Sequence, residues 1–245
     1  MAGGRLCQIG ETRVLMVEQL SRSPFLAEVS FSLATGQVYC LMGPSGVGKS
    51  VLLRALADLE PHRGEVIWRG QKQSAMPAPQ WRRKVMWFGA ETAWWHDSVQ
   101  AHFDEIAQWR VQVDQSYENN AEKSEKSQNS QSCLFAEDFR TDLEMGIARL
   151  GLTMPILQKP VWQLSSGEKQ RLALLRGLLL RPEVLLLDEV TANLDGESTK
   201  RVEAWVQAFV AEGERTVLWV THDVVQAARL TQQVWHLDKT GLRQG

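Results

Sequence analysis

The segment Gly43–Ser50, with the sequence GPSGVGKS, constrains the fold of this chain more than any other segment. It follows an apolar, strand-like run at 38–42 and precedes a helix-like run at 51–56. Glycines between a strand end and a helix start allow backbone N–H groups to surround an anion, and the helix N-terminus adds a partial positive charge. A lysine and a serine at the end of such a loop bind the β- and γ-phosphates and Mg²⁺, respectively. The sequence therefore predicts a nucleotide site formed by Gly43, Pro44, Ser45, Gly46, Val47, Gly48, Lys49 and Ser50.

Composition sets the outer limits of the interpretation. The chain has 245 residues, 44% of them hydrophobic, and a net charge of −2, so it can bury a full core but lacks the basic balance of a nucleic-acid binder. Its three cysteines, Cys7, Cys40 and Cys133, lie far apart, which suits a reducing compartment, and we expect Cys40 to be a small core residue. No apolar run reaches the roughly 18 residues of a membrane span, and the N-terminus lacks a signal-peptide core. We expect a soluble protein whose attachment to a membrane depends on a partner.

The order of strand-like and helix-like segments predicts a mixed α/β domain with a largely parallel central sheet. Runs that are almost wholly apolar indicate strands covered on both faces by helices. The expected strands are 13–18, 27–33, 38–42, 64–68, 184–187, 217–220 and 234–237. The expected helices are 50–59, 168–180, 197–210 and 224–230.

One segment interrupts this order. Residues 114–132 are almost purely Ser, Asn, Gln, Glu and Lys, and such a segment cannot bury enough apolar area to offset the entropy of ordering it. We expect a disordered surface loop there, either a tolerated insertion or a regulatory element, between helices at about 99–112 and 135–150. The predicted organisation is a single domain, 1–245, with a nucleotide-binding core at about 1–90 and 161–245 and a helical subdomain at about 91–160.

Two adjacent acids end the apolar strand at 184–187. Neighbouring side chains on a strand face opposite ways, so Asp188 and Glu189 can have different tasks. Next to a phosphate loop, Asp188 can hold Mg²⁺ directly or through water, and Glu189 can polarise the attacking water. Without the loop the pair would be no more than a polar strand end.

A short polar motif stands at the start of the helix expected at 168–180. Read alone, LSSGE at 164–168 is a helix N-cap in which Ser165 or Ser166 accepts the first N–H groups. Together with the following KQR, it resembles the signature motif of ATP-binding cassette (ABC) ATPases. In the usual family form the third and fourth positions are both Gly and the fifth is Gln, so Ser166 and Glu168 depart from it. The resemblance implies that Ser165, Ser166, Gly167 and Glu168 contact the γ-phosphate of ATP held by the opposite subunit.

Further motifs follow in the order of that family. Asp195, in ANLD at 192–195, resembles the loop that crosses the family's dimer interface, and His222 follows an apolar strand where the family has its switch histidine. By resemblance, His222 holds the γ-phosphate, Glu189 and the water in line, and Lys49 and Glu189 complete the catalytic set of an ATPase. The resemblance extends from about 13 to 238. It implies a P-loop NTPase fold of ABC type, with a mostly parallel sheet flanked by helices, an antiparallel β subdomain and a small helical subdomain.

Two positions depart from the family. Its Mg²⁺-sensing glutamine falls on Ala90 when the sequences are matched without gaps, with Glu91 beside it. Either Glu91 substitutes as a metal-site residue through a one-residue shift, or this contact is missing. The family also stacks an aromatic residue on adenine near the end of the first strand region, but residues 20–23 contain none and Phe25 is the nearest.

The expected partners follow from the same resemblance. The chain has ten tryptophans, and several, including Trp94 and Trp95, fall where ABC transporters bind a helix of their membrane subunit. Being adjacent, these two could not both face one core if the segment is extended, so at least one is a candidate contact, whereas Trp81 and Trp87 are expected in a core.

We therefore predict an ATPase subunit with ATP and Mg²⁺ as cofactors. It pairs with a second ATPase subunit, with a homodimer preferred, and drives an integral membrane permease from the cytoplasmic face of the cell membrane. The overall sequence is similar to bacterial ATPases assigned to iron export. The alternatives are a non-transport ABC ATPase acting on nucleic acid or ribosomes, which usually has coiled-coil arms or two cassettes, and a slow regulatory nucleotide-binding module.

Overall fold

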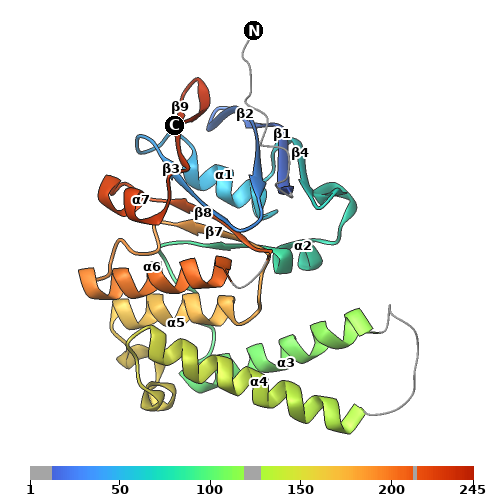
Figure 1. Cartoon of the computed structure of the whole chain (residues 1–245), viewed down its shortest axis with the longest axis vertical. Helices are drawn as coiled ribbons and strands as arrows, with labels where there is room; N and C mark the ends of the chain where they lie inside the picture. Colours follow the sequence, from blue (N-terminus) through green and yellow to red (C-terminus); the bar gives the residue numbers. More distant parts are fainter. Residues whose placement is uncertain (1–12, 119–127, 212–213) are drawn as a thin grey trace. The chain divides into compact units, whose positions relative to one another are not determined.

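The computed structural model describes residues 13–118, 128–211 and 214–245, with the backbone alone described at 111–118 and 128–137. Its contacts divide the chain into two compact units (Figure 1). The first unit comprises residues up to Gly89, Pro182–Val190 and Val206–Gly245, and the second comprises Ala90–Arg181 and Thr191–Trp205. The second unit is larger than the helical subdomain predicted at 91–160, because it also takes in residues 161–181 and 191–205.

The first unit contains two sheets. A six-stranded sheet has the order β10-β9-β3-β8-β7-β6, in which neighbours from β9 to β6 are parallel and β10 is antiparallel to β9. Its strands are β3 (Gln37–Met42), β6 (Val85–Phe88), β7 (Val184–Asp188), β8 (Thr216–Val220), β9 (Val234–Asp238) and β10 (Gly241–Gln244). An antiparallel sheet has the order β2-β1-β4-β5. Its strands are β1 (Arg13–Arg22), β2 (Leu26–Ala34), β4 (Arg63–Trp68) and β5 (Gln71–Lys72).

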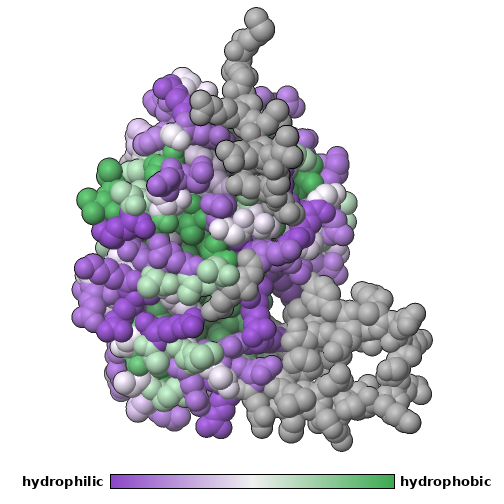
Figure 2. Space-filling model, viewed as in Figure 1, coloured by the Kyte–Doolittle hydropathy of each residue, from purple (hydrophilic) through white to green (hydrophobic). Residues whose placement is uncertain are grey.

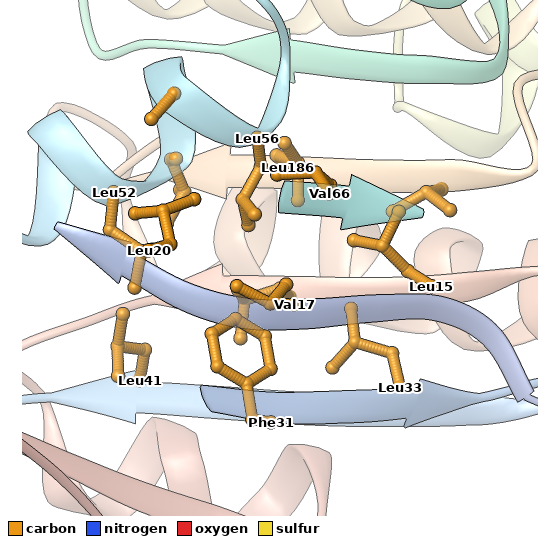
Figure 3. Packing of buried hydrophobic residues seen from close by; sticks show 14 of the residues in the cluster. Leu15, Val17, Leu20, Phe31, Leu33, Leu41, Leu52, Leu56, Val66 and Leu186 are labelled. Atoms are coloured by element: carbon orange, nitrogen blue, oxygen red, sulfur yellow. The ribbon is translucent and has the colours of Figure 1, made fainter. Parts of the chain in front are cut away.

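The core of this unit is formed by both sheets and helix α1 (Lys49–Leu56) (Figure 3). Leu15, Val17 and Leu20 of β1 share one cluster with Leu52 of α1 and Leu186 of β7. Alternate residues of β7 join this cluster because successive strand residues point to opposite faces. The same alternation brings Asp188, two residues after Leu186, to the α1 side at the carboxyl end of the strand. The unit also contains α2 (Ala78–Lys84), α7 (Val224–Leu230) and the last turns of α6 (Gly196–Ala211) from Val206 onward.

The second unit is helical. It contains α3 (Val99–Glu118), α4 (Gln128–Arg149), α5 (Ser166–Leu178), two 3₁₀ turns at Met154–Gln158 and Val161–Gln163, and the first part of α6 (Gly196–Ala211). Gly146 permits a close approach of α4 to α5, because a Cβ at this position would lie 2.4 Å from Cδ1 of Leu175. An ion-pair network ties α3 to α4, since Asp142 accepts from Arg110 at 2.7 Å and from Arg181 at 2.8 Å.

Most elements predicted from the sequence are present. The seven expected strands and six expected helices occur with shifted ends, and Cys40 is buried in β3 as expected. The loop predicted at 114–132 is wrong at both ends, since 114–118 continue α3 and 128–132 begin α4, while 119–127 lie outside the described residues. Glu, Gln and Lys favour helix once a neighbouring amphipathic segment has nucleated it. Within the described residues no helix combines the length and apolar character that crossing a bilayer requires.

Candidate functional site

The loop between β3 and α1 has a backbone that only glycine adopts easily. Gly43, Gly46 and Gly48 have φ of 149°, 75° and 106°. A Cβ at Gly43 would lie 2.2 Å from the carbonyl oxygen of Leu237, and one at Gly48 would lie 2.4 Å from that of Phe25. Gly48 is the N-cap of α1, and no side chain within the described structure caps this helix. The N–H groups of the first turn of α1 are therefore open to an anion, as the sequence predicts for a phosphate loop.

Lys49 is buried within this loop. Its side chain is folded back, and Nζ donates hydrogen bonds to the carbonyl oxygens of Gly43 at 2.8 Å and Pro44 at 2.9 Å. Burial lowers the pKa of Lys49 from its ordinary value, while the negative charges of Glu189 and Asp188 oppose this change. An ammonium group at this position is held ready for phosphate, whose oxygens can replace the two weaker carbonyl acceptors.

Ser50 and Asp188 lie together beside the loop. The Ser50 side chain forms a hydrogen bond with the carboxylate of Asp188. Burial raises the pKa of Asp188, and Glu189 adds to this, whereas the hydrogen bond from Ser50 and the charge of Arg54 act in the opposite direction. A magnesium ion would relieve the cost of a buried carboxylate, since Mg²⁺ binds through one or two protein oxygens together with substrate phosphates.

Ser50 and Asp188 therefore fit the magnesium ion that this type of site implies. Among the described residues, no cluster of three or more His, Cys, Asp and Glu side chains could hold a metal ion by itself. The remaining ligands would come from phosphate oxygens and water, which is the usual arrangement for magnesium in nucleotide sites.

Glu189 and His222 form a pair at the ends of two adjacent strands. Nε2 of His222 lies 2.5 Å from Oε1 of Glu189, and both side chains are partly exposed. The backbone N–H of Glu189 donates to the carbonyl oxygen of Val220 at 3.2 Å, which holds the turn after β7 against β8. Glu189 has a φ of 55°, a conformation that costs energy for a residue with a side chain. The strained turn directs its carboxylate toward His222, where a water molecule could be deprotonated.

The residues around His222 fix the start of α7. Asp223 is the N-cap and accepts from the N–H groups of Val225 at 2.8 Å and Gln226 at 3.1 Å. The hydroxyl of Thr221 accepts from the N–H of Asp223 at 3.1 Å and donates to Gln226 at 2.6 Å. His222 is thus held between two ordered neighbours while its ring stays accessible.

The signature residues form an N-terminal cap in the second unit. Ser165 is the N-cap of α5: its hydroxyl accepts from the N–H of Glu168 at 3.2 Å, and the Glu168 carboxylate accepts from the N–H of Ser165 at 2.8 Å. Lys159 also donates to Glu168, at 3.0 Å. Burial acts to raise the pKa of Glu168, but these hydrogen bonds outweigh it and the net shift is downward. The acid found in place of the family's glutamine is therefore a capping-box partner.

Two further predicted positions belong to the second unit. Asp195 caps α6, accepting from the N–H of Ser198 at 2.8 Å and from its hydroxyl at 2.7 Å. Ala90 and Glu91 follow β6, and Glu91 is exposed. The metal role of Glu91 and the interface role of Asp195 stay predictions.

A small cluster of Phe25, Arg22, Glu60 and Arg54 lies next to the phosphate loop and was not predicted from the sequence. Phe25 is 56% exposed, its backbone carbonyl lies against Gly48, and the guanidinium of Arg22 lies 5.4 Å from its ring centroid. Glu60 holds Arg22 through an ion pair, and it also accepts from Arg54 at 3.2 Å. The signal was present in the sequence only as the nearest aromatic residue, because the turn that brings Phe25 to Gly48 depends on pairing between strands.

Trp94 and Trp95 contact the same two residues. The guanidinium carbon of Arg176 lies 5.1 Å from the Trp94 centroid and 4.3 Å from that of Trp95, and both rings contact His102 edge-on. Burial lowers the pKa of Arg176 to about 10. Both rings therefore lie in one cluster. The expectation that they could not share a core applied only to an extended segment, and this segment forms no strand. Trp95 is still 48% exposed and stacks on Trp109.

Comparison with known proteins agrees with this geometry. A family model described as ABC transporter matches residues 26–192. The probable iron export ATP-binding protein FetA of Escherichia coli (strain K12) is 32% identical over 81% of this chain and 78% of its own length. The Fe(3+) ions import ATP-binding protein FbpC of Agrobacterium fabrum is 30% identical over 85% of this chain, which spans 53% of that protein.

A solved structure has the same fold. A bacterial Atm1-family ABC exporter with ATP bound has a TM-score of 0.72 and 20% identity, covering 97% of this chain and 40% of its own. The family model covers more than half of the chain and the relatives reach 30% identity. The chain belongs to the ABC transporter ATPases, the family that couples ATP hydrolysis to transport.

Proposed function

We propose that this chain is the ATP-hydrolysing subunit of an ABC transporter and that Lys49, Ser50, Asp188, Glu189 and His222 form its catalytic centre. The observation that carries the proposal is the Glu189–His222 contact of 2.5 Å in the same unit as an uncapped, glycine-built phosphate loop.

In this proposal each group has a task that its surroundings support. The loop N–H groups and Lys49 bind the β- and γ-phosphates, and Lys49 neutralises charge that develops on the transferred phosphoryl group. Glu189 accepts a proton from the attacking water, and Nε2 of His222 positions Glu189 and the γ-phosphate. Magnesium, held by Ser50 and Asp188, would supply charge neutralisation between the phosphates.

A second copy of the chain completes the site in this proposal. The N-terminus of α5 carries a partial positive charge, and Gly167 leaves its backbone N–H unobstructed for a γ-phosphate bound by the partner. Two exposed apolar surfaces flank the proposed interface residues. Trp162, just before Ser165, is 75% exposed, and Val224 and Val225 directly follow His222–Asp223. Figure 2 shows hydrophobic surface over α7, where these two valines lie.

A membrane permease is the proposed partner of the second unit. The exposed faces of Trp95 and Trp109, backed by Arg176 and His102, offer a rigid aromatic surface of the kind that anchors a partner helix. Through that partner the chain would lie at the cytoplasmic face of the cell membrane.

The proposed transport function is metal or iron export. FetA, which is named as a probable iron export protein, supports this function, although FbpC is named as an import protein.

The test is affinity purification of this chain from detergent-solubilised native membranes, followed by mass spectrometry. We expect a polytopic membrane protein to co-purify with the chain in near-equal amount. The Trp162→Ala variant should still bind this protein, whereas the Trp95→Ala variant should not. A chain that elutes only with nucleic acid or ribosomal proteins would overturn the transporter assignment.

The export assignment is tested separately. Loss of the gene should raise the iron content of the cell, and an unchanged or lower iron content would contradict export.

A further inference from the structure

The register of β6 and β7 places Trp87 close to the candidate magnesium ligand. Trp87 pairs with Leu186, so Asp188 is its diagonal neighbour two residues further along β7. Trp87 packs against the same core cluster as Leu186, which puts Trp87, Leu186 and Asp188 on one face of the sheet. Diagonal neighbours in a sheet lie within reach of large aromatic side chains.

A glycine directs the Trp87 ring along this diagonal. Gly89 is two residues after Trp87 and directly follows β6, whose last residue Phe88 pairs with Leu187, the residue before Asp188. A Cβ at Gly89 would lie 2.7 Å from Cη2 and 2.8 Å from Cζ2 of Trp87. The indole therefore lies over the position that any other residue's side chain would occupy. Its Cζ2 edge adjoins the N–H group, so the N–H is carried toward the carboxylate end of β7.

The indole N–H of Trp87 has unused hydrogen-bonding capacity. It is buried, and it makes no hydrogen bond of normal geometry with any described residue. The Asp188 carboxylate is a hydrogen-bonding neighbour of this N–H group, at a geometry looser than that of a normal hydrogen bond. A buried donor left without a partner is unfavourable, so a small movement of Asp188 that completes the bond is favoured.

We propose that Trp87 is a positioning residue for Asp188: when nucleotide and magnesium bind, its indole N–H completes a hydrogen bond to the carboxylate and fixes the oxygen that faces the metal. The proposal rests on the proposed ATP site. It also offers a physical reason for the presence of Trp87 and Gly89 just before Ala90, the position of the family's glutamine. In this chain strand β6 itself supplies an N–H donor to the metal site.

The direct test observes the indole proton. Indole ¹H–¹⁵N resonances are recorded for the full chain, and the Trp87 signal is assigned by its loss in Trp87→Phe. We expect this signal to move downfield on addition of a non-hydrolysable ATP analogue with Mg²⁺, and to move little with the analogue in EDTA. A Trp87 signal that is unchanged by Mg²⁺-nucleotide, while calorimetry confirms binding, would overturn the inference. Absence of any nucleotide binding would instead refute the proposed function.

Metal affinity provides the second readout. Removing a group that orients a metal ligand typically weakens metal binding 10- to 100-fold, so Trp87→Phe should raise the Mg²⁺ concentration needed for tight analogue binding about tenfold. Analogue affinity in EDTA should not change. Gly89→Ala should have the same effect, since it keeps the indole but displaces it.

Trp219→Phe is the matched control. Trp219 is also a buried tryptophan whose indole N–H has no partner among the described residues. It lies on strand β8, next to β7, but on the face opposite to Leu218 and Val220. An equal loss in Trp219→Phe would contradict the positioning role.

Discussion

Replacing Lys49 by alanine tests the phosphate loop directly. In the structure Lys49 is 6% exposed, and the two hydrogen bonds of its ammonium group go to backbone carbonyls of the loop itself. On ATP binding these bonds would be exchanged for bonds to phosphate. A hydrogen bond between charged groups contributes about 1.5–3 kcal/mol, so the Kd for ATP should rise about 10- to 150-fold in Lys49→Ala.

The stability of the free protein separates this effect from unfolding. Water can replace the ammonium at the carbonyls of Gly43 and Pro44, so the free energy of unfolding without nucleotide should change by less than about 1 kcal/mol. Kd is measured by isothermal titration calorimetry and stability by urea unfolding. Lys72→Ala, which removes an exposed lysine from edge strand β5, is the control and should leave the Kd unchanged. An unchanged Kd in Lys49→Ala would refute the assignment of the loop as a phosphate site.

Three further variants test other parts of the structure. Gly48→Ala should weaken ATP binding and cost about 2 kcal/mol or more in urea unfolding, because its Cβ would meet the Phe25 carbonyl at a φ that alanine rarely adopts. Glu168 has a lowered pKa in the folded state, so its contribution to stability is present above its ordinary pKa and is lost as the pH falls through the lowered value. Glu168→Gln should therefore lose less stability than the wild type between about pH 5 and pH 3, and equal losses in urea unfolding would contradict the capping role. Arg176→Met should lower the free energy of unfolding by about 2 kcal/mol through loss of two cation–π contacts and the hydrogen bond to the Ala93 carbonyl; no change would show that the aromatic cluster does not depend on the cation.

The parts predicted well from the sequence are those in which local sequence determines local structure. Gly43, Gly46 and Gly48 stand where positive φ is required, and Ser165, one of the two serines expected to cap the helix, is its N-cap. The apolar run before Asp188 is a fully buried strand. In each case the pattern lies within a few residues, so no knowledge of tertiary contacts was needed.

The parts not predicted depend on contacts between distant segments. Trp87 faces Asp188 only because β6 pairs with β7, about a hundred residues later in the chain, with one particular register. Arg176 lies over the rings of both Trp94 and Trp95 because α5 packs on the segment after β6, a contact that the sequence alone did not predict. Register and helix packing are set by the whole core, so single-segment patterns do not determine them.

The most direct test of the central claim uses Glu189→Gln. The amide keeps an oxygen that can accept from His222 but cannot take a proton from water, and loss of a general base reduces turnover about 10²- to 10⁴-fold. ATPase rate is measured together with molar mass by size-exclusion chromatography and light scattering, with ATP·Mg²⁺ present. We expect at least about a hundredfold slower hydrolysis and a stable dimer that forms only with ATP. Near-normal hydrolysis by a chain that stays monomeric with ATP would contradict it.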